Sequence, residues 1–85
     1  MIDRKLVGSI VRRYRKNKNL TQEQLSGLAG LDRTHYSKIE RGLRSPNLET
    51  LFKITYALDI LPHVLIKSIE EEVKLQFDES EQEIK

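Results

Sequence analysis

Two residues, Gly30 and Leu31, separate two short segments that both carry helix-capping signals. In the first segment, Thr21 is followed three residues later by Gln24, which is the pattern of a capping box. In the second, Asp32 can accept hydrogen bonds from the free N–H groups at a helix start. Glycine at the junction permits the left-handed backbone that ends a helix. A connection this short between capped helices makes them meet at a sharp corner.

Apolar residues recur at helical spacing along the rest of the chain, and no segment keeps the strict alternation of a half-buried strand. The sequence therefore predicts an all-α fold. The expected helices cover about residues 3–16, 21–30, 32–42 and 47–58, with a fifth helix that starts at Pro62. Their core-facing residues are expected to be Leu6, Val7, Ile10, Val11, Tyr14, Leu25, Leu28, Tyr36, Ile39, Leu48, Leu51, Phe52, Ile54, Leu58, Leu61 and Leu65. Gly27 lowers the stability of the second helix by about 1 kcal/mol relative to alanine, unless tight packing requires it.

The composition limits the size and setting of the protein. The 85 residues suffice for one domain with a modest core, and the absence of cysteine excludes disulfides and thiolate metal sites. No apolar stretch approaches the roughly 20 residues of a membrane span, and the N-terminus lacks the apolar region of a signal peptide. We therefore expect a cytoplasmic protein, with one domain over residues 1–77 and an acidic, frayed tail over residues 78–85.

The net charge of +2 conceals an asymmetry along the chain. Residues 1–45 contain eleven Lys and Arg against four Asp and Glu, whereas residues 46–85 contain four against nine. The N-terminal part thus carries +7 and the remainder −5. This distribution attracts polyanions and indicates nucleic acid or an anionic membrane surface as a partner, with an ordinary solvated surface as the alternative.

The helix after the glycine corner has one polar face. We expect Tyr36, Ile39 and Glu40 to point inward, and a rotation of 100° per residue then defines the opposite face. That rotation places Thr34, Lys38 and Arg41 on the opposite face, with Ser37 beside them. Arg33 lies in the first turn, and its long side chain can reach round to the same face. A helix with these hydrogen-bond donors suits the major groove of DNA, although two short helices with a glycine corner also occur in other proteins.

The stretch from Gly8 to Leu65 resembles the Xre family, the bacterial and phage regulators that include the lambdoid repressors and Cro proteins. The positions that match the family pattern are Arg15, Leu20–Leu25, Ala29–Gly30, Ser37–Gly42, Pro46, Leu48–Leu51, Lys53–Ile54, Ala57–Leu58 and Pro62. The resemblance implies a five-helix DNA-binding domain of the lambda-repressor type with a helix-turn-helix, here with an extended fifth helix.

The resemblance also implies roles for single residues. The positions that it implies to face DNA are Gln22, Arg33, Thr34 and Lys38. It further implies a structural ion pair between Arg15 and Glu40, which sets the angle of the third helix; an ordinary exposed pair would be worth little. Tyr36 stands where the family usually has a branched aliphatic residue, so its hydroxyl needs a partner. His35 replaces a common aromatic residue and can contact a phosphate or have no role.

These residues together predict sequence-specific DNA binding by a transcriptional regulator. Phosphates supply most of the attraction and bases supply the choice of sequence. Besides Gln22, the expected phosphate contacts come from the loop after the third helix: Arg44, Ser45 and Asn47. In the major groove, Arg33 and Lys38 can each bind a guanine, and Thr34 can contact a thymine methyl group. We expect a homodimer on a roughly palindromic operator, with its two reading helices about 34 Å apart.

The apolar pattern continues beyond the residues that the core needs. Leu61 and Leu65 suffice to close the domain. A further apolar seam follows at helical spacing and consists of Ile66, Ile69, Val73 and Phe77. We expect this seam to pack against the same helix of a second copy, related by a two-fold axis, because an exposed stripe is costly in water. The alternative is that the stripe folds back on its own domain.

Several narrower questions stay open at this point. The run from Asp32 to Ser37 also resembles the controller proteins of restriction-modification systems, but phage repressors and developmental regulators share this helix. The operator sequence and the choice between repression and activation are not encoded in such patterns. A protein-interaction module, in which the fifth helix holds a toxin or another regulator, is the alternative function. The cations around the third helix favour DNA.

An enzyme is not expected. Nucleophile, base and orienting group must converge in an active site, and this chain offers two distant histidines, His35 and His63, and no cysteine. The acidic run Glu70–Glu72 does not predict a metal site, because consecutive helical residues point about 100° apart. His63 is expected on the surface. We therefore predict no catalytic residue, metal or cofactor.

Overall fold

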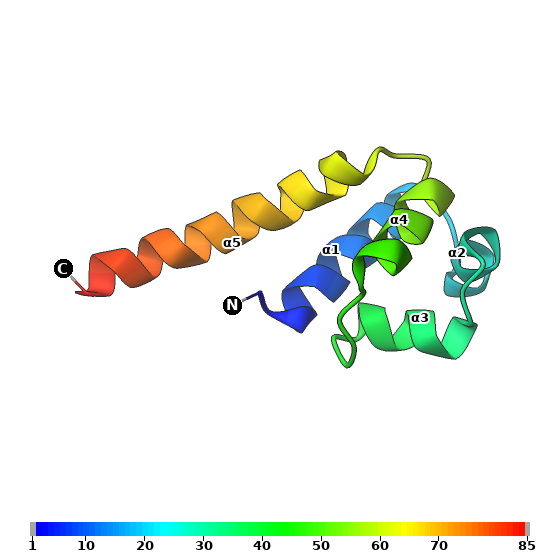
Figure 1. Ribbon diagram of the computed structural model, residues 1–85, viewed down its shortest axis with the longest axis horizontal. Coiled ribbons are helices and arrows are strands. Elements are labelled where there is room, and N and C mark those ends of the chain that lie inside the picture. The colour runs from blue at the N-terminus through cyan, green and yellow to red at the C-terminus, as the bar shows by residue number, and fades with distance from the viewer. Residues whose placement is uncertain (1, 85) are drawn as a thin grey trace.

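Five helices make up the computed structural model, which describes residues 2–84, with side chains for residues 2–75. The helices are α1 (Arg4–Asn17), α2 (Gln22–Ala29), α3 (Arg33–Glu40), α4 (Leu48–Ala57) and α5 (Pro62–Ile84). In Figure 1, α5 and α3 lie on opposite sides of α1 and α4, and α2 lies at the end away from the C-terminus of α5. Residues 2–84 include no strand, which confirms the predicted all-α, five-helix fold.

Side-chain caps determine where the first four helices begin. A backbone N–H in the first turn of each helix is accepted by the side chain of its cap: Asp3, Thr21, Asp32 and Asn47. Thr21 and Gln24 form both hydrogen bonds of the predicted capping box, at 3.0 and 2.9 Å. Gly30 ends α2 with a left-handed backbone at φ +67°. The corner between α2 and α3 therefore forms as the sequence predicts.

The core lies between all five helices. Its buried apolar residues are Val7, Ile10, Val11, Leu25, Ala29, Tyr36, Ile39, Leu51, Ile54, Leu58, Leu65 and Ile69. Leu6 and Tyr14 are partly buried against this cluster. The core prediction is wrong for four residues, which are between 52% and 71% exposed: Leu28, Leu48, Phe52 and Leu61. On α4 the core side is already filled by Leu51, Ile54 and Leu58, so the remaining apolar residues lie on the outer flank.

Gly8 allows the backbones of α1 and α3 to come unusually close. A Cβ atom at this position would lie 2.4 Å from the carbonyl oxygen of Ile39 and 2.5 Å from that of Glu40. Gly27 in α2 is different, since nothing lies within 4 Å of its ideal Cβ position. Close packing therefore requires glycine in α1, whereas Gly27 only weakens α2.

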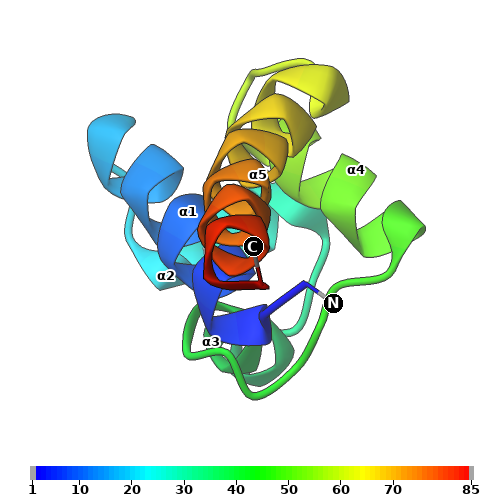
Figure 2. The same ribbon diagram turned by 90° about the vertical axis from the view of Figure 1, so that its left-hand side faces the viewer.

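The long helix α5 packs on α1 and α4, and its C-terminal part projects beyond the other helices (Figure 1). Figure 2 looks along α5 from its C-terminal end. Ile69 is only 6% exposed and belongs to its own core, and Val73 packs against that core. This corrects the predicted intermolecular seam for Ile69, because the helix turns this residue toward α1 and α4. Ile66 is 43% exposed, and the side chain of Phe77 lies outside the described residues.

Two further observations concern α5 and the chain as a whole. Helix α5 continues without a break into the acidic segment, as far as Ile84. Fraying of residues 78–85 stays a prediction. None of the described helices combines the length and the apolar character that a membrane crossing requires.

Candidate nucleic-acid interface

Helix α3 turns one face to the core and the other to solvent. Tyr36 and Ile39 are fully buried and Glu40 is 7% exposed, as the helical rotation predicts. On the outer face, Arg33, Thr34 and Arg41 are exposed and Ser37 and Lys38 are half-buried. These five residues are the outward set predicted from the sequence.

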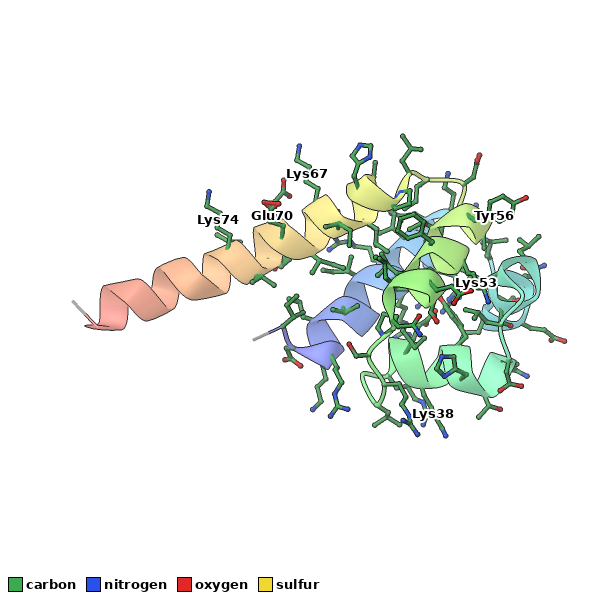
Figure 3. The ribbon with its side chains drawn as sticks, in the orientation of Figure 1. Lys38, Lys53, Tyr56, Lys67, Glu70 and Lys74 are labelled. Atoms are coloured by element: carbon green, nitrogen blue, oxygen red, sulfur yellow. The ribbon has the colours of Figure 1, made fainter. Side chains whose placement is uncertain are left out.

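The outer face of α3 lies on the side of the molecule away from α5. In Figure 3, Lys38 points away from the domain, whereas Lys67 and Lys74 of α5 point from the opposite side. The loop after α3 continues the polar surface with three exposed residues: Arg44, Ser45 and Asn47. The side-chain oxygen of Asn47 also caps α4, since it accepts the N–H of Thr50 at 2.7 Å.

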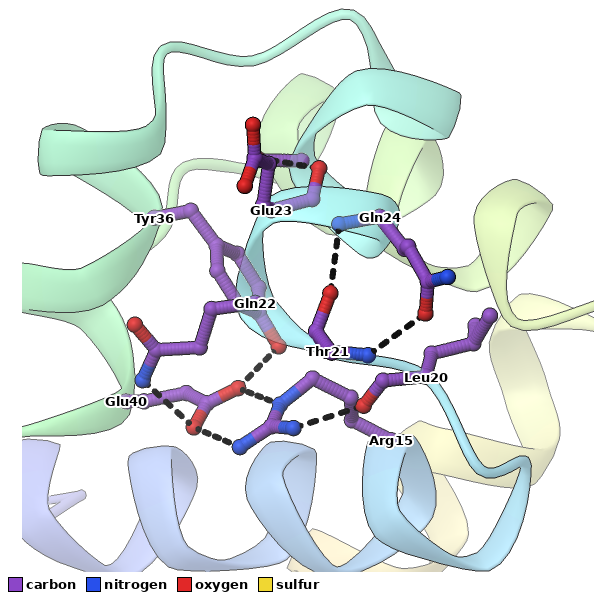
Figure 4. A network of polar contacts seen from close by, with 9 residues as sticks. Arg15, Leu20, Thr21, Gln22, Glu23, Gln24, Tyr36 and Glu40 are labelled. Atoms are coloured by element: carbon purple, nitrogen blue, oxygen red, sulfur yellow. Dashed lines mark hydrogen bonds and ion pairs between the residues drawn. The ribbon is translucent and has the colours of Figure 1, made fainter.

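Glu40 is the centre of a buried polar network that joins three helices (Figure 4). Arg15 of α1 donates to both of its carboxylate oxygens, from Nε at 2.6 Å and from Nη2 at 3.0 Å. The Tyr36 hydroxyl also donates to the carboxylate. A third donor is Nε2 of Gln22 in α2, at 3.2 Å from Oε1. Nη1 of Arg15 donates to the carbonyl oxygen of Leu20 at 2.7 Å, which ties in the chain before α2.

The network fixes the charge states of its members. Burial alone raises the pKa of Glu40, but the hydrogen bonds from Arg15 and Tyr36 outweigh burial and hold that pKa below its ordinary value. The hydrogen bond to Glu40 raises the pKa of Arg15. Burial, with the hydrogen bond to Glu40, raises the pKa of Tyr36. At neutral pH the carboxylate and the guanidinium are therefore charged, and the phenol is neutral.

This geometry settles two expectations about single residues. The predicted pair of Arg15 and Glu40 forms, but it is buried, with exposed fractions of 8% and 7%, so the energetics of a surface pair do not apply. The hydroxyl of Tyr36 finds its partner within the core. Sequence reasoning missed that Gln22 and Tyr36 join this pair, since the four residues meet only after three helices pack.

The remaining predicted residues are less connected to this surface. Gln22 is half-buried and turns its amide nitrogen toward Glu40 rather than lying with the outer residues of α3. His35 is half-buried in α3, and its backbone N–H is accepted by Asp32 as part of the cap. His63 is exposed on α5, as predicted.

Comparison with known proteins identifies the family of this chain. Residues 11–65 match the model of a protein family described as Helix-turn-helix. The chain belongs to the helix-turn-helix family. The control protein C.BamHI of Bacillus amyloliquefaciens is 42% identical to this helix-turn-helix protein over 64 residues, which cover 74% of this chain and 79% of that protein.

Two more relatives agree with this family. The HTH-type transcriptional regulator y4dJ of Sinorhizobium fredii is 42% identical over 57 residues, 67% of this chain and 74% of that protein. The restriction-modification controller protein C.AhdI from Aeromonas hydrophila has a crystal structure that matches this one with a TM-score of 0.72. The two sequences are 40% identical, and the match covers 76% of this chain and 98% of that chain. This helix-turn-helix protein is a sequence-specific DNA-binding transcriptional regulator, which confirms the function predicted from the sequence.

Proposed function

We propose that this regulator binds a two-fold symmetric operator as a homodimer, with α3 of each protomer in the major groove. The observation that carries the proposal is the two-sided character of α3. The buried Glu40 network holds one face against α1 and α2, while Arg33, Thr34 and Arg41 stay exposed on the other. Eight helical residues span only about 12 Å, so one α3 reaches few base pairs and a second copy is needed for selectivity.

Each exposed side chain on α3 has a chemical role in this proposal. Arg33 can donate two hydrogen bonds to O6 and N7 of one guanine, and Lys38 can reach another guanine. The methyl group of Thr34 suits contact with the methyl group of a thymine. Ser37 and Arg41 extend the same surface toward neighbouring bases or phosphates.

Phosphate contacts would hold α3 in register on the duplex. Arg44 and Ser45 lie in the loop directly after α3. Gln22 uses its amide nitrogen toward Glu40, but an amide group has two N–H donors, so the second remains for a phosphate oxygen. Asn47 can donate from its amide nitrogen while its oxygen caps α4.

An apolar groove next to this loop is the surface that we propose for the second copy. Its wall includes Ile2, Leu51, Ile66 and Val73, and Ser45 and Pro46 of the loop after α3 border it. The exposed residues Leu48 and Phe52 of α4 lie beside Leu51 along the helix. The groove borders the loop that follows α3, so the two copies of that loop would lie close together in such a dimer.

The test compares a base contact with a phosphate contact. We expect Arg33→Ala to weaken operator binding by about 1–3 kcal/mol and to relax the preference mainly at one base pair per half-site. Arg44→Ala should lower the affinity for all sequences alike. It should also make the slope of log K against log salt shallower by about 0.9. Binding of a set of operator variants at several salt concentrations measures both effects. An unchanged base preference in the first variant, or an unchanged slope in the second, contradicts the assigned role.

The relatives also support a narrower proposal for the biological role. C.AhdI is named as a restriction-modification controller protein and C.BamHI as a control protein, so a controller role is one candidate, and the position of the selected operator next to an endonuclease gene would support it. Because the named relatives are bacterial regulators, we also propose a cytoplasmic location and no catalytic activity. The projecting end of α5, with Leu75 59% exposed, keeps a protein partner as an additional candidate.

A further inference from the structure

The start of α1 is attached to the loop that follows α3. Nη1 of Arg4 donates to the carbonyl oxygen of Leu43 at 3.3 Å. Gly42 adopts φ +76°, and a Cβ atom there would lie 2.8 Å from Cα of Lys5 and 2.7 Å from its Cγ. These contacts join residues about 39 positions apart in the sequence, and the loop is the one to which the proposed function assigns phosphate contacts.

The same corner of the molecule gathers positive charge. Its four cations are all exposed: Arg4, Lys5, Arg41 and Arg44. The ion pairs among the residues whose side chains are described, Arg15–Glu40 and Lys53–Glu49, involve none of these four. The one acid at the start of α1, Asp3, accepts the backbone N–H of Lys5 at 2.9 Å as the helix cap. Like charges repel one another, so this cluster costs stability unless an external anion compensates it.

The contact of Arg4 with Leu43 leaves most of its hydrogen-bonding capacity unused. A guanidinium group has five N–H donors, and one of them is engaged here. The bond fixes the guanidinium beside the loop while its other donors can bind a further anion. Lys5 adds an ammonium group one residue later.

We propose that the start of α1 is a second phosphate-binding element of the DNA site, in which Arg4 and Lys5 contact backbone phosphates next to those held by the loop after α3. This inference rests on the proposed function. The ligand is the phosphodiester backbone, and the contact is independent of base sequence, since a phosphate carries no sequence information. The DNA surface is therefore composite, built from α3, the following loop and the start of α1.

The experiment neutralises the two cations without shortening the side chains to alanine. For the double variant Arg4→Gln/Lys5→Gln, the slope of log K against log salt should become shallower by up to about 1.8, as each lost phosphate contact contributes about 0.9. Its base preference should not change. The matched control is Lys67→Gln/Lys74→Gln, which removes the same charge from exposed residues of α5 that point away from the side of Lys38 (Figure 3) and should keep the wild-type slope. Equal slopes for all three proteins would overturn the inference, and so would an equal reduction in both variants.

A third variant separates charge from structure. Arg4→Lys keeps the positive charge but loses the guanidinium geometry toward Leu43, so its salt slope should stay close to wild type. A slope as shallow as that of a single neutralisation would show that Arg4 acts only by holding the loop. Thermal unfolding of every variant verifies that the domain is folded. If wild type selects no DNA sequence, the proposed function fails; if wild type selects one and the double variant keeps its slope, only this inference fails.

Discussion

Glu40 is the residue on which the orientation of α3 depends. Its carboxylate accepts hydrogen bonds from Arg15 of α1, Gln22 of α2 and Tyr36 of its own helix. Removing one partner from a buried pair leaves the other charge uncompensated, which typically costs about 3–5 kcal/mol. The residues that we propose to face DNA therefore depend on a buried group on the other face of α3.

The depressed pKa of Glu40 predicts a pH dependence of stability. A carboxylate whose pKa is lower in the folded state stabilises the fold fully above the unfolded pKa, near 4.3 for glutamate, and the contribution disappears as the pH falls through the folded pKa. We expect wild type to lose stability on acidification below about pH 5, and Glu40→Gln to lose less over the same range. Urea unfolding at several pH values measures this difference.

Glu49→Gln supplies the control for this measurement. Glu49 pairs with Lys53 across an exposed 3.9 Å contact, so the substitution makes the same chemical change on the surface. Its acid-induced loss of stability should match wild type. If Glu40→Gln also matches wild type, the carboxylate does not have the role assigned to it.

At the scale of helices, two glycines that look alike in the sequence should respond in opposite ways to alanine. At Gly8 a methyl group would clash with the backbone of α3, so Gly8→Ala should destabilise the domain by about 1–3 kcal/mol. At Gly27 the space is open, and Gly27→Ala should stabilise α2 by about 0.5–1 kcal/mol. Chemical denaturation of both variants gives the two signs. Equal signs would contradict the packing described for α1 and α3.

The helices also show what the sequence could and could not predict. Caps and the glycine corner are local, so Thr21, Asp32 and Gly30 could be assigned from neighbouring residues alone. The exposure of Phe52 could not, because an apolar pattern does not distinguish burial within a chain from burial between chains. The partner of the Tyr36 hydroxyl depends on three helices converging, which no short-range pattern encodes.

At the scale of the whole molecule, α3 and α5 are separated by α1 and α4 (Figure 1). The outer face of α3 could be predicted because helical rotation fixes it, and Thr34 and Arg41 are exposed accordingly. The start of α1 could not be included, since its contact with the loop after α3 is a tertiary one.

The proposed dimer surface is tested by a substitution that places a charge in the apolar groove beside the loop after α3. Ile66 is 43% exposed in the groove wall, so Ile66→Asp should lower the dimer fraction in sedimentation equilibrium and weaken binding to a full palindrome more than to a half-site. Leu28→Asp introduces the same charge at a 59% exposed aliphatic residue on α2 and should leave the dimer unchanged. Equal dimer fractions for both variants and wild type would remove the groove as the interface.

The central claim is that two copies of α3 read one symmetric site. Selection from a random DNA pool by wild-type protein, followed by measurement of the protein-to-duplex ratio on the selected sequence, tests it most directly. We expect a two-fold symmetric consensus with half-site centres about 10–10.5 base pairs, or one helical turn, apart and two protomers per duplex. A pool that does not converge, or an asymmetric sequence bound by a single protomer, would contradict the claim.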